Sequence, residues 1–166
     1  MPAIRLQDVT FRPETDSDED STFMRKLFCS LEQVQSLMQF GEQAELLIDM
    51  QLRSREQQYR VVYPDGSFQL ILLNGEPVGR FATDQSNDTW HIIDIALMPA
   101  CRGHLLGMRI VQQFLRSADA AGRAVAASVL ASNVKARKLW QHVGFQVVDE
   151  KPDYWYLLFS PSRSDD

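Results

Sequence analysis

The chain has 166 residues, of which 45% are hydrophobic and 23% charged, so it fits one globular domain and excludes a disordered chain or a coiled-coil rod. Seventeen Lys and Arg against 22 Asp and Glu give a net charge of −5, so nucleic acid is not an expected partner. Cys29 and Cys101 lack the paired spacing of a zinc site, and we expect no metal. No signal peptide or membrane helix is evident, which predicts a cytoplasmic protein without membrane contacts.

The N-terminal part is predicted to form a strand and then two helices. Residues 4–11 alternate apolar and polar side chains before Pro13, which favours a strand. The acidic run 16–20 could be an interaction patch, but carboxylates also stabilise the start of a helix, and apolar residues follow at helical spacing up to Leu31. A second helix is predicted over 42–57, with residues 32–41 as a connection that breaks at Gly41.

The middle of the chain predicts three strands. Residues 68–73 and 77–82 are joined at Asn74-Gly75, a pair that supplies the positive φ of a hairpin turn. Residues 90–97 are almost continuously apolar, which is typical of a central strand buried on both faces.

The C-terminal part alternates helices and strands. A helix follows Gly107 and ends at Gly122, a strand covers 125–130, and Ser132 or Asn133 caps a short helix that ends at Gly144. Residues 145–149 and 154–159 complete the sheet. The predicted fold is a single α/β (α+β) domain over residues 1–166, with a mixed, largely antiparallel sheet of six to seven strands and about four helices; residues 160–166 are expected to be a disordered tail.

Two segments point to a site. Arg102 to Gly107 links the central strand to a helix, where free backbone N–H groups can hold a pyrophosphate, although the segment matches neither the dinucleotide nor the P-loop pattern. Downstream lie Asn133, Ala136, Leu139, Trp140 and then Gly144-Phe145. Together these segments resemble the GNAT superfamily of acyl-CoA-dependent N-acyltransferases, and the resemblance covers nearly the whole chain.

The resemblance implies acetyl-CoA as cosubstrate, with its pantetheine arm between splayed fourth and fifth strands. Backbone groups of Ile95, Ala96 and Leu97 would pair with the pantetheine. The remaining cofactor-binding positions that it implies are Arg102, Gly103, His104, Leu105, Leu106, Gly107, Met108, Asn133, Lys135, Ala136, Lys138 and Trp140. Arg102, Lys135 or Lys138 would screen the pyrophosphate, although the two lysines could also form an ordinary solvated helix face.

This sequence departs from the family pattern twice. Leu105 replaces the middle glycine of the loop, and a right-handed helical conformation there would still direct its N–H toward the phosphates. Trp140 stands where many members carry a tyrosine thought to protonate the leaving thiolate; an indole has no useful acidity, so Trp140 would pack or stack beside the pantetheine.

Transfer to an amine needs a base, an oxyanion donor and an acid for the thiolate. The resemblance places His91 at a base position, with a plain structural histidine as the equal alternative and Asp94 as another base or ammonium-binding group. A backbone N–H of a bulged strand around Ile95 to Leu97 would bind the oxyanion. Tyr154, Tyr156, His142 or water would protonate the thiolate.

The acceptor is expected to be an amine of a small molecule, peptide or protein, in a pocket walled by Phe28, Gln35, Phe40 and Glu45. The aromatic strand 154–159 would expose an apolar edge if unpaired, which suggests a homodimer. The leading hypothesis is an acetyl-CoA-dependent N-acetyltransferase. The alternative, motivated by Leu105 and Trp140, is a CoA-binding regulatory module without turnover.

Overall fold

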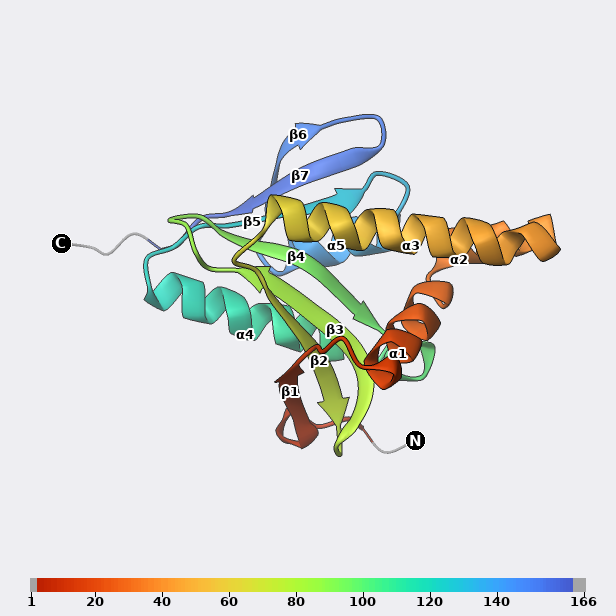
Figure 1. The fold of residues 1–166 in the computed structure, drawn as a ribbon. Helices are drawn as coiled ribbons and strands as arrows, with labels where there is room; N and C mark the ends of the chain where they lie inside the picture. Colours follow the sequence, from red (N-terminus) through yellow and green to blue (C-terminus); the bar gives the residue numbers. More distant parts are fainter. Residues whose placement is uncertain (1–2, 163–166) are drawn as a thin grey trace.

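The computed structural model describes residues 3–162 and contains one seven-stranded sheet in the order β1-β2-β3-β4-β5-β7-β6 (Figure 1). Only the β4–β5 pair is parallel, so the predicted mixed, largely antiparallel α/β fold is confirmed. The strands are β1 (Val9–Pro13), β2 (Ser67–Leu73), β3 (Glu76–Asp84), β4 (Trp90–Leu97), β5 (Val125–Leu130), β6 (Gln146–Glu150) and β7 (Tyr154–Phe159).

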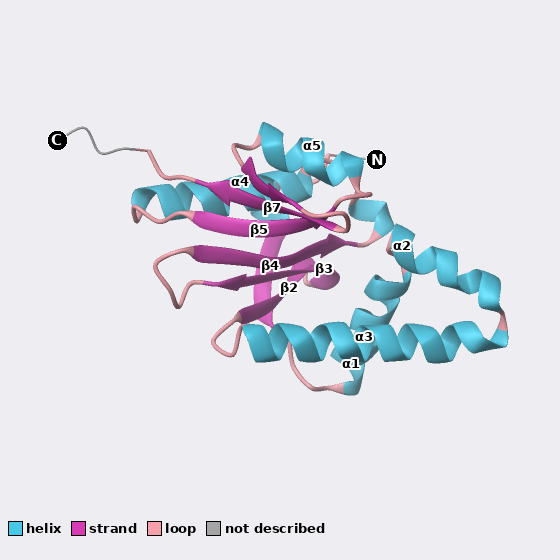
Figure 2. Cartoon of the chain, turned by 90° about the horizontal axis from the view of Figure 1, so that it is seen from above, coloured by secondary structure: helices cyan, strands magenta, loops and turns pink. Residues whose placement is uncertain are grey.

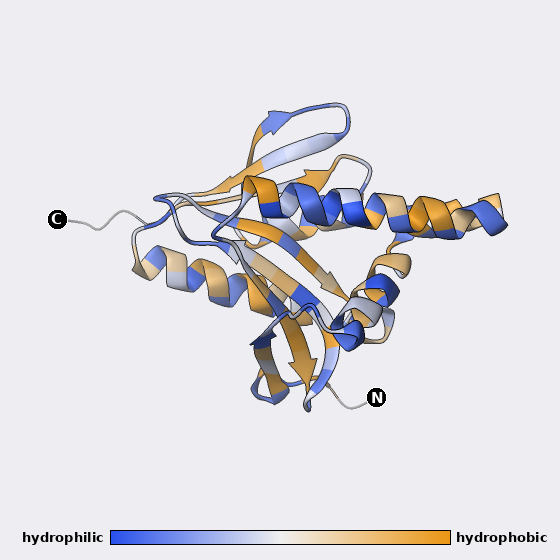
Figure 3. Cartoon of the chain, viewed as in Figure 1, coloured by the Kyte–Doolittle hydropathy of each residue, from blue (hydrophilic) through white to orange (hydrophobic). Residues whose placement is uncertain are grey.

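The helices cover both faces of the sheet, with α4 and α5 on one side and α1 and α3 on the other (Figure 2). The α-helices are α1 (Asp18–Cys29), α2 (Glu32–Gln35), α3 (Glu42–Val62), α4 (Leu106–Ala120) and α5 (Val134–His142). Short 3-10 turns are η1 (Leu6–Asp8), η2 (Ser36–Phe40) and η3 (Pro99–Cys101). The central strands β2 and β4 are largely apolar while the helices are striped, as expected of helices with one packed side (Figure 3).

The predicted first strand begins too early. β1 pairs with β2 from Val9 opposite Leu73, and β2 ends there at the hairpin turn. Residues before Val9 therefore have no strand to pair with, and Leu6–Asp8 turns as η1 while Ile4 and Leu6 pack on the core. The hairpin turn itself is as predicted, because Asn74 and Gly75 both have positive φ.

The acidic run is a helix start, as predicted. The Ser17 side chain caps α1 by accepting a hydrogen bond from Asp20 N–H, and three acidic residues occupy the first turn. The connection over 32–41 is more ordered than predicted, since it contains α2 and η2. The break at Gly41 is confirmed by its φ of 59°, and α3 continues to Val62, beyond the predicted end at residue 57.

The C-terminal strand is not an edge strand. β7 lies between β5 and β6 and pairs with both, so the argument that it exposes an apolar edge is wrong. The sheet edges are β1 and β6 instead. A homodimer stays a prediction without that support. Within residues 3–162, no helix is both long enough and apolar enough to cross a membrane.

The core lies mainly between the sheet and the α4–α5 layer. Phe114, Leu115 and Ala118 of α4 pack with Val125 and Leu157 of the strands, and Trp140 of α5 joins the same cluster. On the other face, Met24 and Leu27 of α1 pack on Leu70. The face of the sheet under α4 and α5 therefore has the larger cluster of buried apolar side chains.

Candidate active site

β4 and β5 separate after their first residues. They pair only at Trp90–Val125 and His91–Ala126, although β4 continues to Leu97 and β5 to Leu130. The predicted splay of the two parallel strands is confirmed. Beyond these pairs, the side of β4 that faces β5 has no ladder partner.

A bulge at Ile93 decides which backbone groups face this opening. Asp94 lies opposite Ala82 and Ile92 opposite Thr83, so Ile93 is the extra residue. The sequence predicted a bulged strand with its oxyanion-binding N–H around Ile95 to Leu97, and the bulge itself lies just before that range. The bulge lies close to the point where β4 stops pairing with β5. Beyond that point β4 pairs with β3 alone.

Backbone direction alternates along the strand after the bulge. Met98 N–H donates to Val78 O of the β3 side, and the Ala96 carbonyl also points to β3, where it would meet any Cβ added at Gly79. Alternation therefore turns the N–H and C=O of Ile95 and Leu97 toward the opening. Ala96 was also expected to pair with the pantetheine, but its backbone N–H and C=O point toward β3 instead.

The loop after β4 leads into α4. Gly103 has a φ of 78°, Leu105 a φ of 59°, and α4 begins at Leu106. Gly107 lies within the first turn, where an added Cβ would meet only Leu97 Cδ1, at 3.6 Å. The right-handed conformation expected at Leu105 is wrong, because the chain enters the first turn of α4 through a left-handed residue at this position.

Arg102 does not extend freely toward this loop. Its Nε donates to Leu97 O at 2.9 Å, and its Nη2 donates to Ser30 Oγ at 3.0 Å and Ser30 O at 3.2 Å. Arg102 therefore bridges the end of β4 and the end of α1, and its pyrophosphate-screening role stays a prediction. His104 lies half-buried in the loop.

The second family segment mainly builds α5. Asn133 Oδ1 accepts from Ala136 N–H at 3.1 Å, which resolves the choice of cap between Ser132 and Asn133. Lys135 and Lys138 are exposed. Trp140 is buried, with its ring centroid 5.1 Å from that of Phe145, so of its two predicted positions it takes the packed one.

His91 faces the α3 side of the sheet. Its ring centroid lies 5.5 Å from that of Tyr63, and its Nδ1 is buried with no hydrogen-bond partner in the described chain. His91 lies opposite Asp84 in the β3–β4 ladder. Hydrogen bonding from Ser86 lowers the pKa of Asp84, with a further contribution from His91, so an ionised carboxylate lies near the imidazole.

The structure contains a buried ionic cluster that was not predicted from the sequence. Arg80 of β3 is 0% exposed and donates to Glu56 through Nη1 at 2.6 Å and Nη2 at 2.8 Å. It also donates to Asp94 Oδ2 at 2.9 Å and lies 3.5 Å from Glu14. Because Ile93 is bulged, His91 and Asp94 both project to this face, which a regular strand would forbid.

The charged groups in the cluster shift one another's pKa values. Burial would lower the pKa of Arg80, but Asp94 and Glu56 hold it above its ordinary value. Burial would raise the pKa of Glu56, and the hydrogen bonds from Arg80 keep it lowered instead. At Glu14 burial prevails and the pKa is raised. One carboxylate oxygen of Asp94 is thus engaged by Arg80, whereas Nδ1 of His91 has no hydrogen-bond partner among the described residues.

The two predicted tyrosines share the face of His91. Leu157 is buried in the α4 cluster and Trp155 lies under Arg137 of α5, so Tyr154 and Tyr156 project from the opposite side. Tyr156 lies opposite Ser128, and Tyr154 opposite Leu130, while His91 is in the row of Ala126. Tyr156 is therefore the nearer of the two, by row, to where β4 and β5 separate.

Most of the residues predicted to line the acceptor pocket make packing, hydrogen-bond or ion-pair contacts within the fold. Phe28 is buried with Val34 and Ile48, Gln35 donates to Cys29 O, and Glu45 pairs with Arg25. Phe40 is exposed. Three of the four candidates thus have structural partners.

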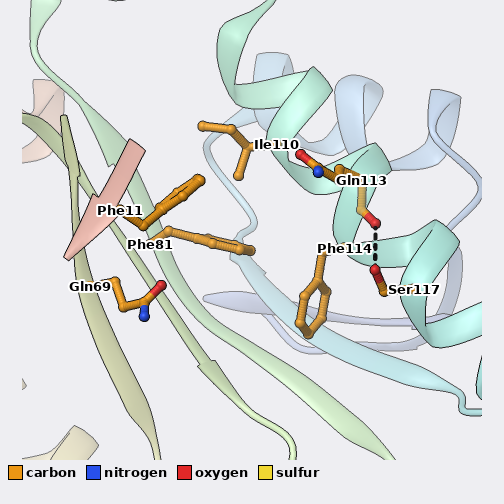
Figure 4. Close-up of a pocket in the computed structure, with 7 residues that line it drawn as sticks. All are labelled: Phe11, Gln69, Phe81, Ile110, Gln113, Phe114 and Ser117. Atoms are coloured by element: carbon orange, nitrogen blue, oxygen red, sulfur yellow. Dashed lines mark hydrogen bonds between the residues drawn. The ribbon is translucent and has the colours of Figure 1, made fainter. Parts of the chain in front are cut away.

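A pocket of about 220 Å³ lies elsewhere, between the β1 end of the sheet and α4 (Figure 4). Its lining residues are Phe11, Gln69, Phe81, Ile110, Gln113, Phe114 and Ser117. None of the predicted site residues lines it. In residues 3–162 no group of three or more His, Cys, Asp or Glu could hold a metal ion.

Comparisons with known proteins agree with this architecture. The sequence model of the acetyltransferase (GNAT) family matches residues 31–145. A solved protein from Pyrococcus horikoshii OT3 has a TM-score of 0.70 at 13% identity, covering 93% of this chain and 99% of that one. The PaiA N-acetyltransferase of Thermoplasma acidophilum, solved with coenzyme A, gives 0.65 at 13% identity, covering 92% and 98%.

The ribosomal-protein-S18-alanine N-acetyltransferase of Escherichia coli has a TM-score of 0.61 at 15% identity, covering 95% of this chain and 97% of that one. No curated protein sequence matches the chain. Identities this low establish similarity of fold, whereas the sequence model covers more than half of the chain. This protein therefore belongs to the GNAT acetyltransferase family.

Proposed function

We propose that the protein is an N-acetyltransferase that moves an acetyl group from acetyl-CoA directly to a primary amine of a small molecule, peptide or protein. The observation that carries the proposal is the opening between β4 and β5, where Ile95 and Leu97 present backbone groups without ladder partners beside the loop 102–107. Acetyl-CoA would supply a thioester carbonyl that an amine can attack. The chain contributes binding, orientation and proton transfer.

The cofactor-binding groups follow from this geometry. Ile95 and Leu97 would pair with the pantetheine amides through their backbone. The N–H groups from Gly103 to Met108 lie at the N-terminal end of α4, which favours a pyrophosphate. Lys135 and Lys138 are exposed and able to add positive charge. Asn133, Ala136 and Trp140 have structural roles that explain them without the cofactor.

His91 is the proposed base. An imidazole titrates near neutral pH, so it can accept the proton of an ammonium acceptor and return it to solvent. It lies at the last paired row before the opening, and Asp84 lies opposite it in the ladder. Asp94 remains bound to Arg80 and would act on the substrate only through its other carboxylate oxygen.

The N–H of Ile95 is the proposed oxyanion donor, because it is the first amide beyond the bulge that faces the opening. Tyr156 is the leading acid for the thiolate, since it faces the same side and lies opposite Ser128, two residues along β5 from Ala126 of the last β4–β5 pair. Tyr154 and water stay as alternatives. His142 is less suited, because α5 covers the other face of the sheet.

A second candidate is a CoA-binding regulatory module without turnover. Burial of Trp140 favours it, because no phenol occupies the position of the family tyrosine. The two candidates share a fold and a ligand and differ only in whether thiol is released.

The deciding experiment is calorimetric titration with acetyl-CoA and desulfo-CoA, beside a free-thiol assay over a panel of primary amines. Micromolar binding with thiol release supports the enzyme, and binding alone supports the regulatory module. No binding would contradict both.

Two variants test the loop. Gly107→Glu places a carboxylate at the start of α4 and should reduce acetyl-CoA affinity by at least about tenfold through charge repulsion. Gly107→Ala is the matched control, since its Cβ would have room 3.6 Å from Leu97 Cδ1. Equal affinity of a folded Gly107→Glu protein would remove the loop from the binding site.

His91→Ala tests the base. We expect kcat to fall on the order of 100-fold near neutral pH, with recovery as rising pH deprotonates the amine without help. His142→Ala on α5 is the control and should leave the rate unchanged. A pH–rate profile identical to that of the wild type would assign His91 a structural role.

We propose that residues 1–166 form one domain, because a single sheet draws strands from both ends of the described chain. Part of the predicted tail, residues 163–166, lies outside the described residues.

A further inference from the structure

Arg102 links the end of β4, five residues before it, to the end of α1, which lies 72 residues away in the sequence. Its Nε donates to Leu97 O at the end of β4, and its Nη2 donates to both the hydroxyl and the carbonyl of Ser30. Ser30 follows the last residue of α1. Arg102 is also the first residue of the loop 102–107, so one guanidinium connects that loop, β4 and α1.

The α1 end needs such a partner. The last carbonyls of a helix have no partners within the helix, and a cation there offsets the helix dipole. Ser30 Oγ donates to Leu27 O at 2.6 Å, and Gln35 donates to Cys29 O. The Ser30 carbonyl is then satisfied from outside the segment, by Arg102.

The β4 end of the bridge is a group that faces the opening. Backbone alternation after the bulge turns Leu97 C=O toward the side where the proposed pantetheine would pair. Arg102 Nε occupies that oxygen at 2.9 Å. A ligand that hydrogen-bonds to β4 at Leu97 therefore acts on a carbonyl already linked to α1.

We propose that Arg102 is a positioning residue that couples occupancy of the loop 102–107 and the β4 edge to the order of the α1–α2 corner, residues 28–40. The inference rests on the proposed CoA site. It assigns Arg102 a role different from direct screening of the pyrophosphate. The planar guanidinium is required, because it donates in two directions at once, whereas an ammonium carries the same charge on one point.

The test compares Arg102→Lys with Arg109→Lys. Both variants keep the charge. Arg109 is a suitable control because it is exposed on α4, next to the same loop, and its Nη1 donates to Ile4 O at 3.4 Å rather than to α1 or β4. CoA itself is the probe, and the readouts are its affinity by calorimetry and hydrogen exchange of peptides with and without CoA.

In the wild type, CoA should slow exchange both in the loop 102–108 and in residues 28–40. In Arg102→Lys we expect CoA affinity within about threefold of the wild type, as for loss of exposed hydrogen bonds, with protection confined to the loop. Arg109→Lys should show protection in both regions.

Two results would overturn the coupling alone: protection of 28–40 in Arg102→Lys equal to that in the wild type, or no protection of 28–40 in a wild type that binds CoA. A tenfold or greater loss of CoA affinity in Arg102→Lys, absent in Arg109→Lys, would assign Arg102 to the phosphates instead. Failure of the wild type to bind CoA would overturn the proposed function and, with it, the coupling.

Discussion

The two faces of the sheet bury different kinds of side chain. Under α4 and α5 the buried side chains are apolar, from Ile92 and Val125 to Phe114 and Leu115. Under α3 the largest fully buried side chain is Arg80, held by Glu56 and Asp94. Further along that face, Tyr154 and Tyr156 are 41% and 44% exposed.

The apolar face mainly stabilises the fold, whereas the charged face carries the proposed reacting groups. An apolar face gains free energy from burial whatever the pH, because no group in it titrates. Buried charges are stable only while each has its partner, and they respond to pH and to substitution. The proposed reacting groups, His91 and Tyr156, lie on the charged and partly open face, with the apolar face as rigid support.

The largest effect is expected from breaking the ionic cluster. Arg80→Met should lower the free energy of unfolding by about 3–5 kcal/mol, because Glu56 and Asp94 stay buried without their cation. Urea unfolding measures the loss, which should shrink as acid protonates the carboxylates. The triple variant Arg80→Met, Glu56→Leu, Asp94→Leu should recover much of it; no recovery would mean that packing rather than charge is lost.

A slightly smaller loss is expected on the apolar face. Leu115 is buried against the strands, so Leu115→Ala should cost about 3 kcal/mol through lost burial and the cavity left behind. Arg116→Ala, exposed on the same helix, should cost less than about 0.5 kcal/mol. Unlike that of Arg80→Met, the Leu115→Ala loss should not vary with pH, and a strong pH dependence would contradict the comparison.

A third, pH-dependent effect concerns the start of α1. Asp20 accepts from Arg12 at 2.7 and 2.8 Å and from Thr15, and these hydrogen bonds lower its pKa. Its ionised form therefore stabilises the fold above the unfolded pKa of about 3.9, and that stability is lost as pH falls below it.

Asp20→Asn should thus cost about 2 kcal/mol at pH 7, with a difference from the wild type that narrows as the pH falls below about 4. Asp18→Asn is the control in the same helical turn, where the side chain is exposed. A constant difference between Asp20→Asn and the wild type across this pH range would show that the carboxylate charge is unimportant.

The smallest expected effect is an increase in the free energy of unfolding. Leu105 has a φ of 59° and is 54% exposed, so its side chain contributes little packing while its Cβ strains the turn. Leu105→Gly should raise the free energy of unfolding by about 1 kcal/mol, and Leu105→Ala should not, because alanine keeps the Cβ. Destabilisation by Leu105→Gly would imply that the exposed leucine makes a stabilising contact.

Local patterns determined much of this protein from the sequence alone. The bounds of β4, β5 and β7, the turn at Asn74-Gly75, a cap at Ser132 or Asn133 and the loop 102–107 all follow from residues that are neighbours in the chain. Such signals depend on periodicity, capping and backbone freedom, which act over a few residues. The family resemblance, confirmed by the match over residues 31–145, rests on motifs of the same short range.

Only the tertiary structure decided the rest. The ionic cluster gathers Glu14, Glu56, Arg80 and Asp94 from four separate segments, and no local pattern links them. The bulge at Ile93 comes from the register with β3, and it alone places His91 and Asp94 on one face. The bridge from Arg102 to Ser30 and the interior place of β7 likewise depend on which segments meet. Pairing between distant segments is a property of the assembled fold, because its free energy arises only when the whole sheet forms.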